Sequence, residues 1–140
     1  MSGAAEHGNG LVSVRSSLSM AETVKHLVVA LERRGMVLFA RIDHAKAASE
    51  VGLKLRPEEL FVFGYPEAEA PLIAKYPLLG VDFPQRLLVR EDEHGGVWIS
   101  YASPVAIGRR LGVEADVSRL EAIADSLAGI AAEAVGKAGS

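Results

Sequence analysis

The sequence predicts an α+β domain in which long helices lie on one face of an antiparallel sheet. Two amphipathic helical segments stand near the two ends of the chain, and short apolar runs typical of strands lie between them. With 140 residues, 49% of them apolar, the chain has the size and composition of one domain with its own core. We expect this domain to span residues 11–135, with flexible tails at 1–10 and 136–140.

The first elements follow from alternation and from helix-capping residues. Residues 11–14 begin with alternating apolar and polar side chains, which predicts a short strand. Ser19 and Glu22 have the spacing of a capping box, so a long helix should begin there, and Gly35 should end it. Its buried face is expected to carry Val24, Leu27, Val28 and Leu31.

Four further strands are expected at the apolar runs 36–42, 60–63, 85–90 and 97–101. Asp43 should cap a short helix over 43–50, Pro71 should open another over 72–75, and Ser103-Pro104 a third toward Leu111. The loop 92–96 contains two glycines and predicts a hairpin. Ser118 and Glu121 form a second capping box for the last helix, whose alanines permit close packing against a sheet or a partner chain. The predicted order is β-α-β-β-β-β-α with short helical insertions.

Composition removes several classes of function. A net charge of −3 gives no general attraction to nucleic acid or to an anionic membrane, so neither partner is expected. The chain has no cysteine, which excludes disulfides and thiol nucleophiles and fits a reducing cytosol. No apolar run approaches the roughly 20 residues of a membrane span, and residues 1–10 lack the features of a secretory signal. Phosphate-binding glycine motifs are absent. We therefore expect a cytoplasmic protein without a cofactor.

The adjacent residues Asp43 and His44 are the first candidates for chemistry. They stand where a strand ends and a helix begins, and the ordinary pKa of histidine, about 6.5, suits a general acid or base. The alternative is that Asp43 serves only as a helix cap and His44 is its half-exposed neighbour.

The turn Gly64-Tyr65-Pro66 is the second candidate. A glycine after a strand lets a backbone approach a ligand, and the Tyr65 hydroxyl can donate or accept a hydrogen bond. The alternative is a structural turn in which Pro66 fixes φ.

Asp82 and Tyr101 complete the candidate set. Asp82 precedes a strand and could orient His44 or join it at a metal. A single nearby histidine with scattered carboxylates lacks the spacing of a known metal motif, however, so no metal is expected. Tyr101 ends the last strand and lies either at the cleft or in the core or an interface.

These blocks, taken in order, resemble the family catalogued as domain of unknown function 302, over residues 11–111. The resemblance depends on 19–22, Phe39-Ala40-Arg41-Ile42-Asp43-His44-Ala45, residues 51–57, Phe63-Gly64-Tyr65-Pro66, Asp82-Phe83-Pro84, 87–92 and Val97-Trp98-Ile99-Ser100-Tyr101 with Pro104. It implies a fold similar to a single copy of the TATA-binding-protein-like β-α-β(4)-α arrangement, and it implies a homodimer. This chain has Tyr65 where the family usually has Asn, and Phe83 where it usually has Leu. The family has no settled activity, and its fold does not imply DNA binding.

Three functional hypotheses follow. The first is a cytoplasmic homodimeric binding or accessory module with a small-molecule cleft formed by His44, Gly64, Tyr65, Pro66, Asp82 and Tyr101. The second is an enzyme that uses His44 as general acid or base, oriented by Asp43 or Asp82; the sequence leaves open whether any reaction is catalysed. The third is a structural protein that associates through its last helix and its sheet.

Overall fold

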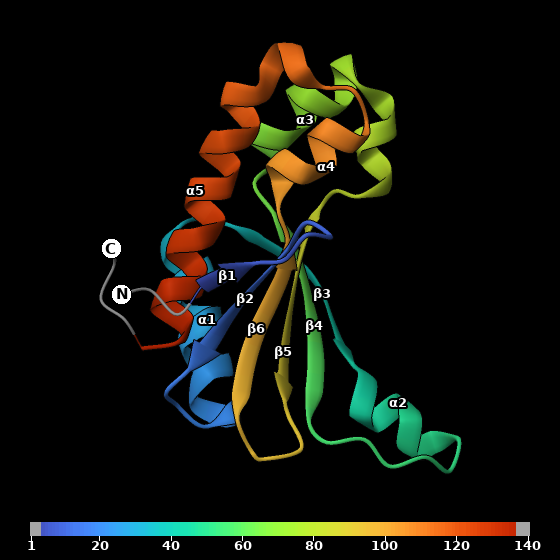
Figure 1. Ribbon diagram of the computed structural model, residues 1–140, viewed down its shortest axis with the longest axis vertical. Helices are drawn as coiled ribbons and strands as arrows, with labels where there is room; N and C mark the ends of the chain where they lie inside the picture. Colours follow the sequence, from blue (N-terminus) through green and yellow to red (C-terminus); the bar gives the residue numbers. More distant parts are fainter. Residues whose placement is uncertain (1–3, 137–140) are drawn as a thin grey trace.

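A computed structural model describes residues 4–136 of the chain. One six-stranded antiparallel sheet has the strand order β1-β2-β6-β5-β4-β3 (Figure 1). Its strands are β1 (Ala4–Glu6), β2 (Leu11–Ser16), β3 (Val37–Asp43), β4 (Glu58–Gly64), β5 (Gln85–Glu91) and β6 (Val97–Ala102). The long helices α1 (Met20–Arg33) and α5 (Val117–Ala134) pack side by side against one face of the sheet.

The main core lies between the sheet and these two helices. Phe61, Leu87 and Ile99 are fully buried on neighbouring strands, and they belong to one apolar cluster with Leu27 of α1 and Leu127 of α5. Strand alternation puts every second residue of β4, β5 and β6 on this face. The predicted α+β class, with its long helices on one face of an antiparallel sheet, is confirmed.

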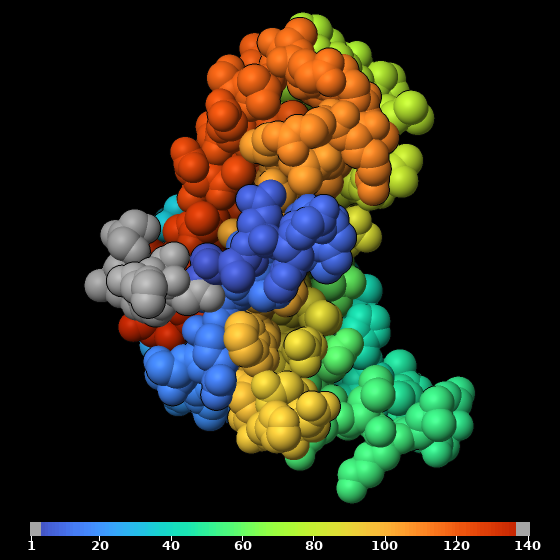
Figure 2. Space-filling view, in the orientation of Figure 1, coloured from blue at the N-terminus to red at the C-terminus, as the bar shows by residue number. Residues whose placement is uncertain are grey.

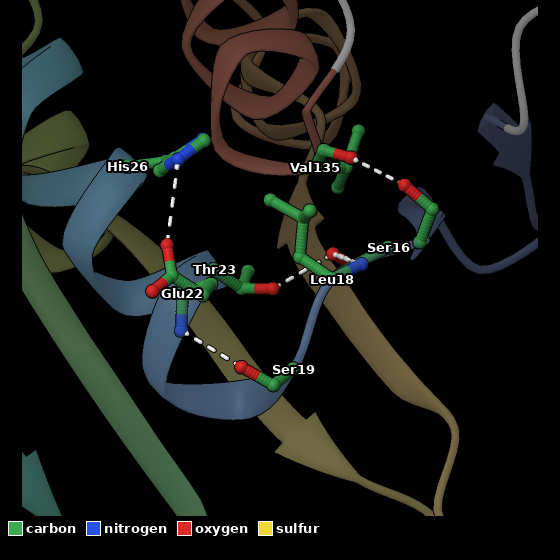
Figure 3. Close-up of polar contacts among 8 residues, drawn as sticks. Ser16, Leu18, Ser19, Glu22, Thr23, His26 and Val135 are labelled. Atoms are coloured by element: carbon green, nitrogen blue, oxygen red, sulfur yellow. Dashed lines mark hydrogen bonds and ion pairs between the residues drawn. The ribbon is translucent and has the colours of Figure 1, made fainter.

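Polar contacts fix the start of α1 to its neighbours (Figure 3). The Ser19 hydroxyl accepts a 3.1 Å hydrogen bond from the amide of Glu22, which confirms the predicted cap. The Glu22 carboxylate lies 3.8 Å from His26. Thr23 and Ser16 are buried and share a 2.7 Å hydroxyl–hydroxyl bond, and the Ser16 hydroxyl also accepts from the amide of Leu18. These bonds hold α1 to the end of β2.

Five short helical segments are inserted between the main elements: α2 (His44–Glu50), α3 (Pro66–Lys75), η1 (Pro77–Val81), α4 (Pro104–Arg110) and η2 (Glu114–Asp116). The predicted cap of α2 is present, because the Asp43 carboxylate accepts a 2.9 Å bond from the amide of Lys46. Helix α3 begins at Pro66 rather than Pro71, since Pro66 occupies its first turn, where a missing amide hydrogen costs nothing. A second apolar cluster, which includes Leu72, Leu79 and Leu120, joins α3, η1 and α5.

Two expectations about the ends of elements are wrong. Residues 4–6, expected in a tail, form strand β1, because they pair with residues 12–14 of β2. Helix α5 begins at Val117, so Ser118 lies inside it and caps nothing. The preceding Asp116 instead accepts bonds from Tyr76 at 2.7 Å and Lys75 at 2.8 Å, which tie the end of α3 to this corner. Positions 1–3 and 137–140 of the expected tails lie outside the described residues.

Within residues 4–136, no helix has the combination of length and apolarity that crossing a bilayer requires.

Candidate functional site

A cavity of about 630 Å³ lies where the end of β4, the start of β5 and the helices α1, α3 and α5 come together. Its apolar wall includes Met36, Pro71 and Ile123. Its polar wall is formed by Arg34, Tyr65, Glu67, Glu69, Gln85, Arg119 and Ser126. A mostly apolar hollow with a few polar groups is typical of small-molecule sites.

Two of these polar side chains are buried and bonded to each other. Glu69 of α3 is 5% exposed and Gln85 of β5 is 6% exposed. The Gln85 amide nitrogen donates to Glu69 Oε2 at 2.6 Å, and the backbone amide of Tyr65 donates to the same oxygen at 2.8 Å. Two donors on one oxygen partly offset the cost of burying a carboxyl group. These bonds join α3 to β5 and form a polar part of the cavity wall.

Gly64 makes room for the Glu69 carboxyl group. A Cβ atom at position 64 would lie 2.6 Å from Glu69 Oε1, far closer than ordinary packing permits. The φ angle of Gly64 is not in the left-handed region, so the need for glycine here comes from space rather than from backbone conformation. The group that lies close to Gly64 is the Glu69 side chain of the same chain, so the approach of a ligand to this backbone stays a prediction.

Arg34, just after α1, contributes positive charge at the opposite wall. One of its guanidinium nitrogens lies 3.6 Å from the Glu133 carboxylate of α5. Gly129 permits this placement, because a Cβ atom there would lie 2.7 Å from Arg34 Nη2. The Arg34 Nε atom is buried and has no hydrogen-bond partner among residues 4–136.

Two residues that line the cavity each have a buried polar atom, one a donor and one an acceptor, without a hydrogen-bond partner among residues 4–136. The acceptor is Gln85 Oε1, which is buried and has no hydrogen-bond partner within the described part of the chain. The side-chain nitrogen of the same residue donates to Glu69. The donor is Arg34 Nε–H. Buried polar atoms are nearly always bonded in folded proteins, so an unpaired one needs an explanation.

A second hollow, of about 640 Å³, lies between the β1–β2 turn and α4. Its lining residues, which include Asn9, Ser103 and Arg109, are all exposed or half-buried. It therefore lacks the buried, unsatisfied groups that distinguish the first cavity.

The structure separates Asp43 and His44 from the rest of the predicted site. Strand β3 pairs Val37 with Gly64 at one end and Asp43 with Glu59 at the other. At about 3.3 Å per residue, the length of this strand places Asp43 roughly 20 Å from the Gly64 end of the sheet. The expectation that His44, Tyr65 and Asp82 share one cleft within a chain is therefore wrong.

Asp82 lines a smaller hollow of about 260 Å³ with Leu60 and Leu88, which lie on the sheet face opposite α1 and α5. Tyr101 borders the same hollow, but it belongs to the main core cluster with Val97 and Ile99. The Asp82 carboxylate is paired with Arg110 and, at 3.4 Å, with Arg86, so it is neutralised rather than free to orient a histidine. Tyr101 is 7% exposed, and burial, together with the charge of Glu6, raises the pKa of its hydroxyl. Among residues 4–136, no three histidine or carboxylate side chains cluster as a metal site would require.

Of the predicted ligand-binding residues, Tyr65 lines the 630 Å³ cavity, whereas Gly64 lies behind the lining residue Glu69 and Pro66 begins α3. The Tyr65 hydroxyl donates a 3.4 Å bond to Glu67. The residues that the sequence analysis missed are Glu69, Gln85 and Arg34. Gln85 has a sequence signal, because it shares the period-two face of Leu87 and Val89 and so falls on the buried side of β5.

The comparisons with known proteins agree with this architecture. Residues 12–134 match the family described as "Domain of unknown function DUF302". The chain belongs to the DUF302 family. The crystal structure of an uncharacterized conserved DUF302 protein from Bacillus stearothermophilus superposes with a TM-score of 0.83, covering 89% of this chain and 98% of that one. The two sequences are 21% identical, so this likeness concerns the fold alone. The further likeness to the TATA-binding-protein-like arrangement remains a prediction.

Curated proteins that are similar to this DUF302 chain are named as ion channels. Proteins of Brucella suis and Brucella abortus, both named "Fluoride-specific ion channel FluC 1", are 38% identical to it over 112 residues. The match covers 79% of this chain but only 44% and 42% of those proteins. The chain therefore spans less than half the length of the curated relatives that it matches.

Proposed function

We propose that this DUF302 chain is a homodimeric binding module whose main cavity accepts a small organic molecule carrying both a hydrogen-bond donor and an acceptor. The observation that carries the proposal is the unpaired Gln85 Oε1, buried in the cavity wall next to Glu69. Amino acids, carboxamides and nucleobases have the required pairing of donor and acceptor. The apolar wall formed by Met36, Pro71 and Ile123 would contact the remainder of such a molecule.

An accessory role within a larger system is part of the same proposal. The support for it is that a similar segment occurs inside longer proteins named as fluoride-specific ion channels. The homodimer is implied by the family resemblance, and the cytoplasmic location is expected from the composition. An enzyme that uses His44 has less support, because His44 is remote from Asp82 and from the cavity of its own chain.

The experiment is a thermal-shift screen of purified protein against amino acids, carboxamides and nucleobases, followed by native mass spectrometry of each hit. Compounds that bind the folded state raise the melting temperature. Ala122 is an exposed residue of α5 that lines the cavity, so Ala122→Phe should narrow the cavity without disturbing the core and should weaken or abolish the shift. Ala128→Phe is the matched control, because Ala128 is exposed on the same helix but does not line the cavity.

Gln85→Leu gives an independent second test, provided that circular dichroism shows the variant to be folded. It removes the open acceptor, so hits should weaken by roughly tenfold or more if they bond to it. Hits that shift Ala122→Phe as strongly as the unmodified protein would place the binding elsewhere and overturn the proposal.

A further inference from the structure

Residues 37–57, which comprise β3, α2 and the loop that leads to β4, form a surface that we call the arm. Its residues are all exposed except for three half-buried ones in α2. Seven of the twelve exposed large apolar side chains of the described residues lie in it: Val37, Leu38, Phe39, Ile42, Val51, Leu53 and Leu55. Solvent-facing apolar groups gathered in one stretch are typical of an interaction surface.

The arm is not held by the core of its own chain. Helix α2 has no buried residue, and neither apolar core cluster contains a residue from 37–57. A helix of seven residues is too short to be stable in water without packing. In Figures 1 and 2 helix α2 and the loop after it, coloured teal to green, project away from the rest of the molecule, while β3 lies in the sheet beside β4. Within the described residues, the arm is held mainly by the pairing of β3 with β4 and by Arg41, which bonds to Glu59 and stacks on Phe61, while its apolar side chains stay exposed.

Strand β3 is also an edge strand. It pairs only with β4, so one side of its backbone offers unpaired amide and carbonyl groups over seven residues. The other edge strand, β1, has only three residues. Long edges of this kind invite another strand. The arm thus presents an open backbone edge and apolar side chains together.

The charges of the arm indicate what kind of partner fits it. Arg41 is paired with Glu59 through two hydrogen bonds, at 2.7 and 2.9 Å, and Arg56 is paired with Glu91 at 2.5 Å. The remaining charges, Asp43, Lys46, Glu50 and Lys54, sum to zero. A surface without net charge has no attraction for nucleic acid or anionic lipid, and it can face an identical surface without repulsion.

We propose that the arm is the docking surface for a second copy of this chain, with the two β3 strands side by side and antiparallel about a two-fold axis. A two-fold interface uses the same patch on both subunits, and an antiparallel strand pair has this symmetry. The arm has 21 residues, which matches the roughly 20–30 residues per side of a standard interface. This inference rests on the proposed homodimer and specifies where its two chains meet.

The antiparallel arrangement has a consequence for the cavity. Helix α2 follows the Asp43 end of β3, whereas Met36, Gly64 and Tyr65 lie at the Val37 end, next to the cavity. Each arm would therefore extend toward the cavity end of the other chain. The partner's His44 would then lie nearer to the site than His44 of the same chain does.

The test begins with the mass of the protein in solution, measured by size-exclusion chromatography with light scattering at micromolar concentration. The unmodified chain is expected to be a dimer. Leu53→Asp and Phe39→Lys should raise the dimer dissociation constant by roughly 30-fold or more, because each puts a charge into the apolar contact. Leu78→Asp is the matched control for Leu53→Asp, since Leu78 is 67% exposed and Leu53 is 65% exposed. It should leave the dimer intact.

A cross-linking experiment tests the arrangement of the strands. The chain has no cysteine, so single cysteines can be placed without background. Ala40→Cys, near the middle of β3, should form a disulfide between two chains on mild oxidation, whereas Val29→Cys, on an exposed part of α1, should not.

The possible outcomes distinguish three claims: the homodimer, its contact at the arm and the antiparallel pairing of the two β3 strands. A monomeric unmodified chain overturns both the homodimer and its placement. A dimer that survives Leu53→Asp and Phe39→Lys overturns the placement and leaves the homodimer standing. Loss of the dimer in these variants, without a disulfide in Ala40→Cys, supports the arm and rejects the antiparallel β3 pair. Ligand binding is tested separately with the Ala122→Phe variant, so a failure of the ligand proposal can be distinguished from a failure of the dimer proposal.

Discussion

The side-chain amide of Gln85 donates a 2.6 Å hydrogen bond to the carboxyl group of Glu69, and the two buried residues join β5 to α3 at the wall of the main cavity. Tyr65 adds its backbone amide to the same carboxyl oxygen. This arrangement fixes the end of β4, the start of α3 and the start of β5 relative to one another. It leaves the Gln85 carbonyl oxygen without a partner within residues 4–136.

The contribution of this pair can be measured with a double-mutant cycle in urea. Glu69→Leu should lower the free energy of unfolding by about 1–3 kcal/mol for each donor left unpaired, namely the Gln85 amide and the Tyr65 backbone amide. Adding Gln85→Leu should recover part of this loss, because only the Tyr65 amide then remains unpaired. Strictly additive effects would show that the two side chains do not interact.

Gly64→Ala should destabilise the protein by about 1–3 kcal/mol, because its Cβ would overlap the Glu69 carboxyl group, which is buried and bonded to Gln85 and to the Tyr65 amide. Gly80→Ala is the control, since a Cβ there meets only Ile73 at an ordinary 3.7 Å. Chemical denaturation of both variants makes the comparison. Equal stability of the two would mean that Glu69 moves aside freely.

Thr23→Val should lower the free energy of unfolding by about 1–3 kcal/mol, because the buried Ser16 hydroxyl loses its 2.7 Å partner. Thr23→Ser keeps the hydroxyl and should lose less. Thermal and urea unfolding of the two variants separate the hydrogen bond from the packing of the Thr23 methyl group. A greater loss for Thr23→Ser would contradict the importance of the bond shown in Figure 3.

Asp92 gives a prediction about pH. Hydrogen bonds from the Trp98 indole at 2.8 Å, and then from the backbone amides of Gly96 and His94, lower the pKa of its carboxyl group from 3.8 to about 2. The charged form is therefore the one that the hairpin favours. Its stabilising effect is fully present above pH 3.8 and is lost as the pH falls toward 2.

The indole amide resonance of Trp98 reports this titration, because Trp98 is the only tryptophan of the chain. Its chemical shift should change with a midpoint at about pH 2. Asp92→Asn should remove the transition. A midpoint near the ordinary 3.8 would show that the bond is not maintained in solution.

Local signals in the sequence were sufficient where a capping side chain or a glycine fixes the end of an element. Ser19 starts α1, Asp43 caps α2, and Gly35 and Gly52, both with positive φ, follow the two helices. Strand β1 has no such signal, because Ala4–Glu6 is a strand only through pairing with β2. Capping motifs and alternation can be recognised from residues that are close in the sequence. Pairing with a strand that is distant in the sequence cannot be recognised in this way.

In the candidate site, too, the residues with a local sequence signal could be predicted and those that depend on long-range pairing could not. Turn chemistry predicts Gly64 and Tyr65 as site residues, and of these Tyr65 lines the cavity while Gly64 contacts the lining residue Glu69. His44 is predicted beside them because it also follows a strand. Antiparallel pairing, however, puts the C-terminal end of β3 and the C-terminal end of β4 at opposite ends of the strand pair. Glu69 was missed because only the fold shows that this face of α3 is buried.

The independence of the arm from both cores bears on how such proteins diversify. The exposed apolar side chains of residues 37–57 belong to neither core cluster, so their substitution is expected to change the free energy of folding little. Under the proposed docking of two arms, selection can alter which chains recognise one another without first compensating for lost stability. Two DUF302 chains in one cell could evolve to pair separately through changes in this stretch alone, while their interiors stay the same.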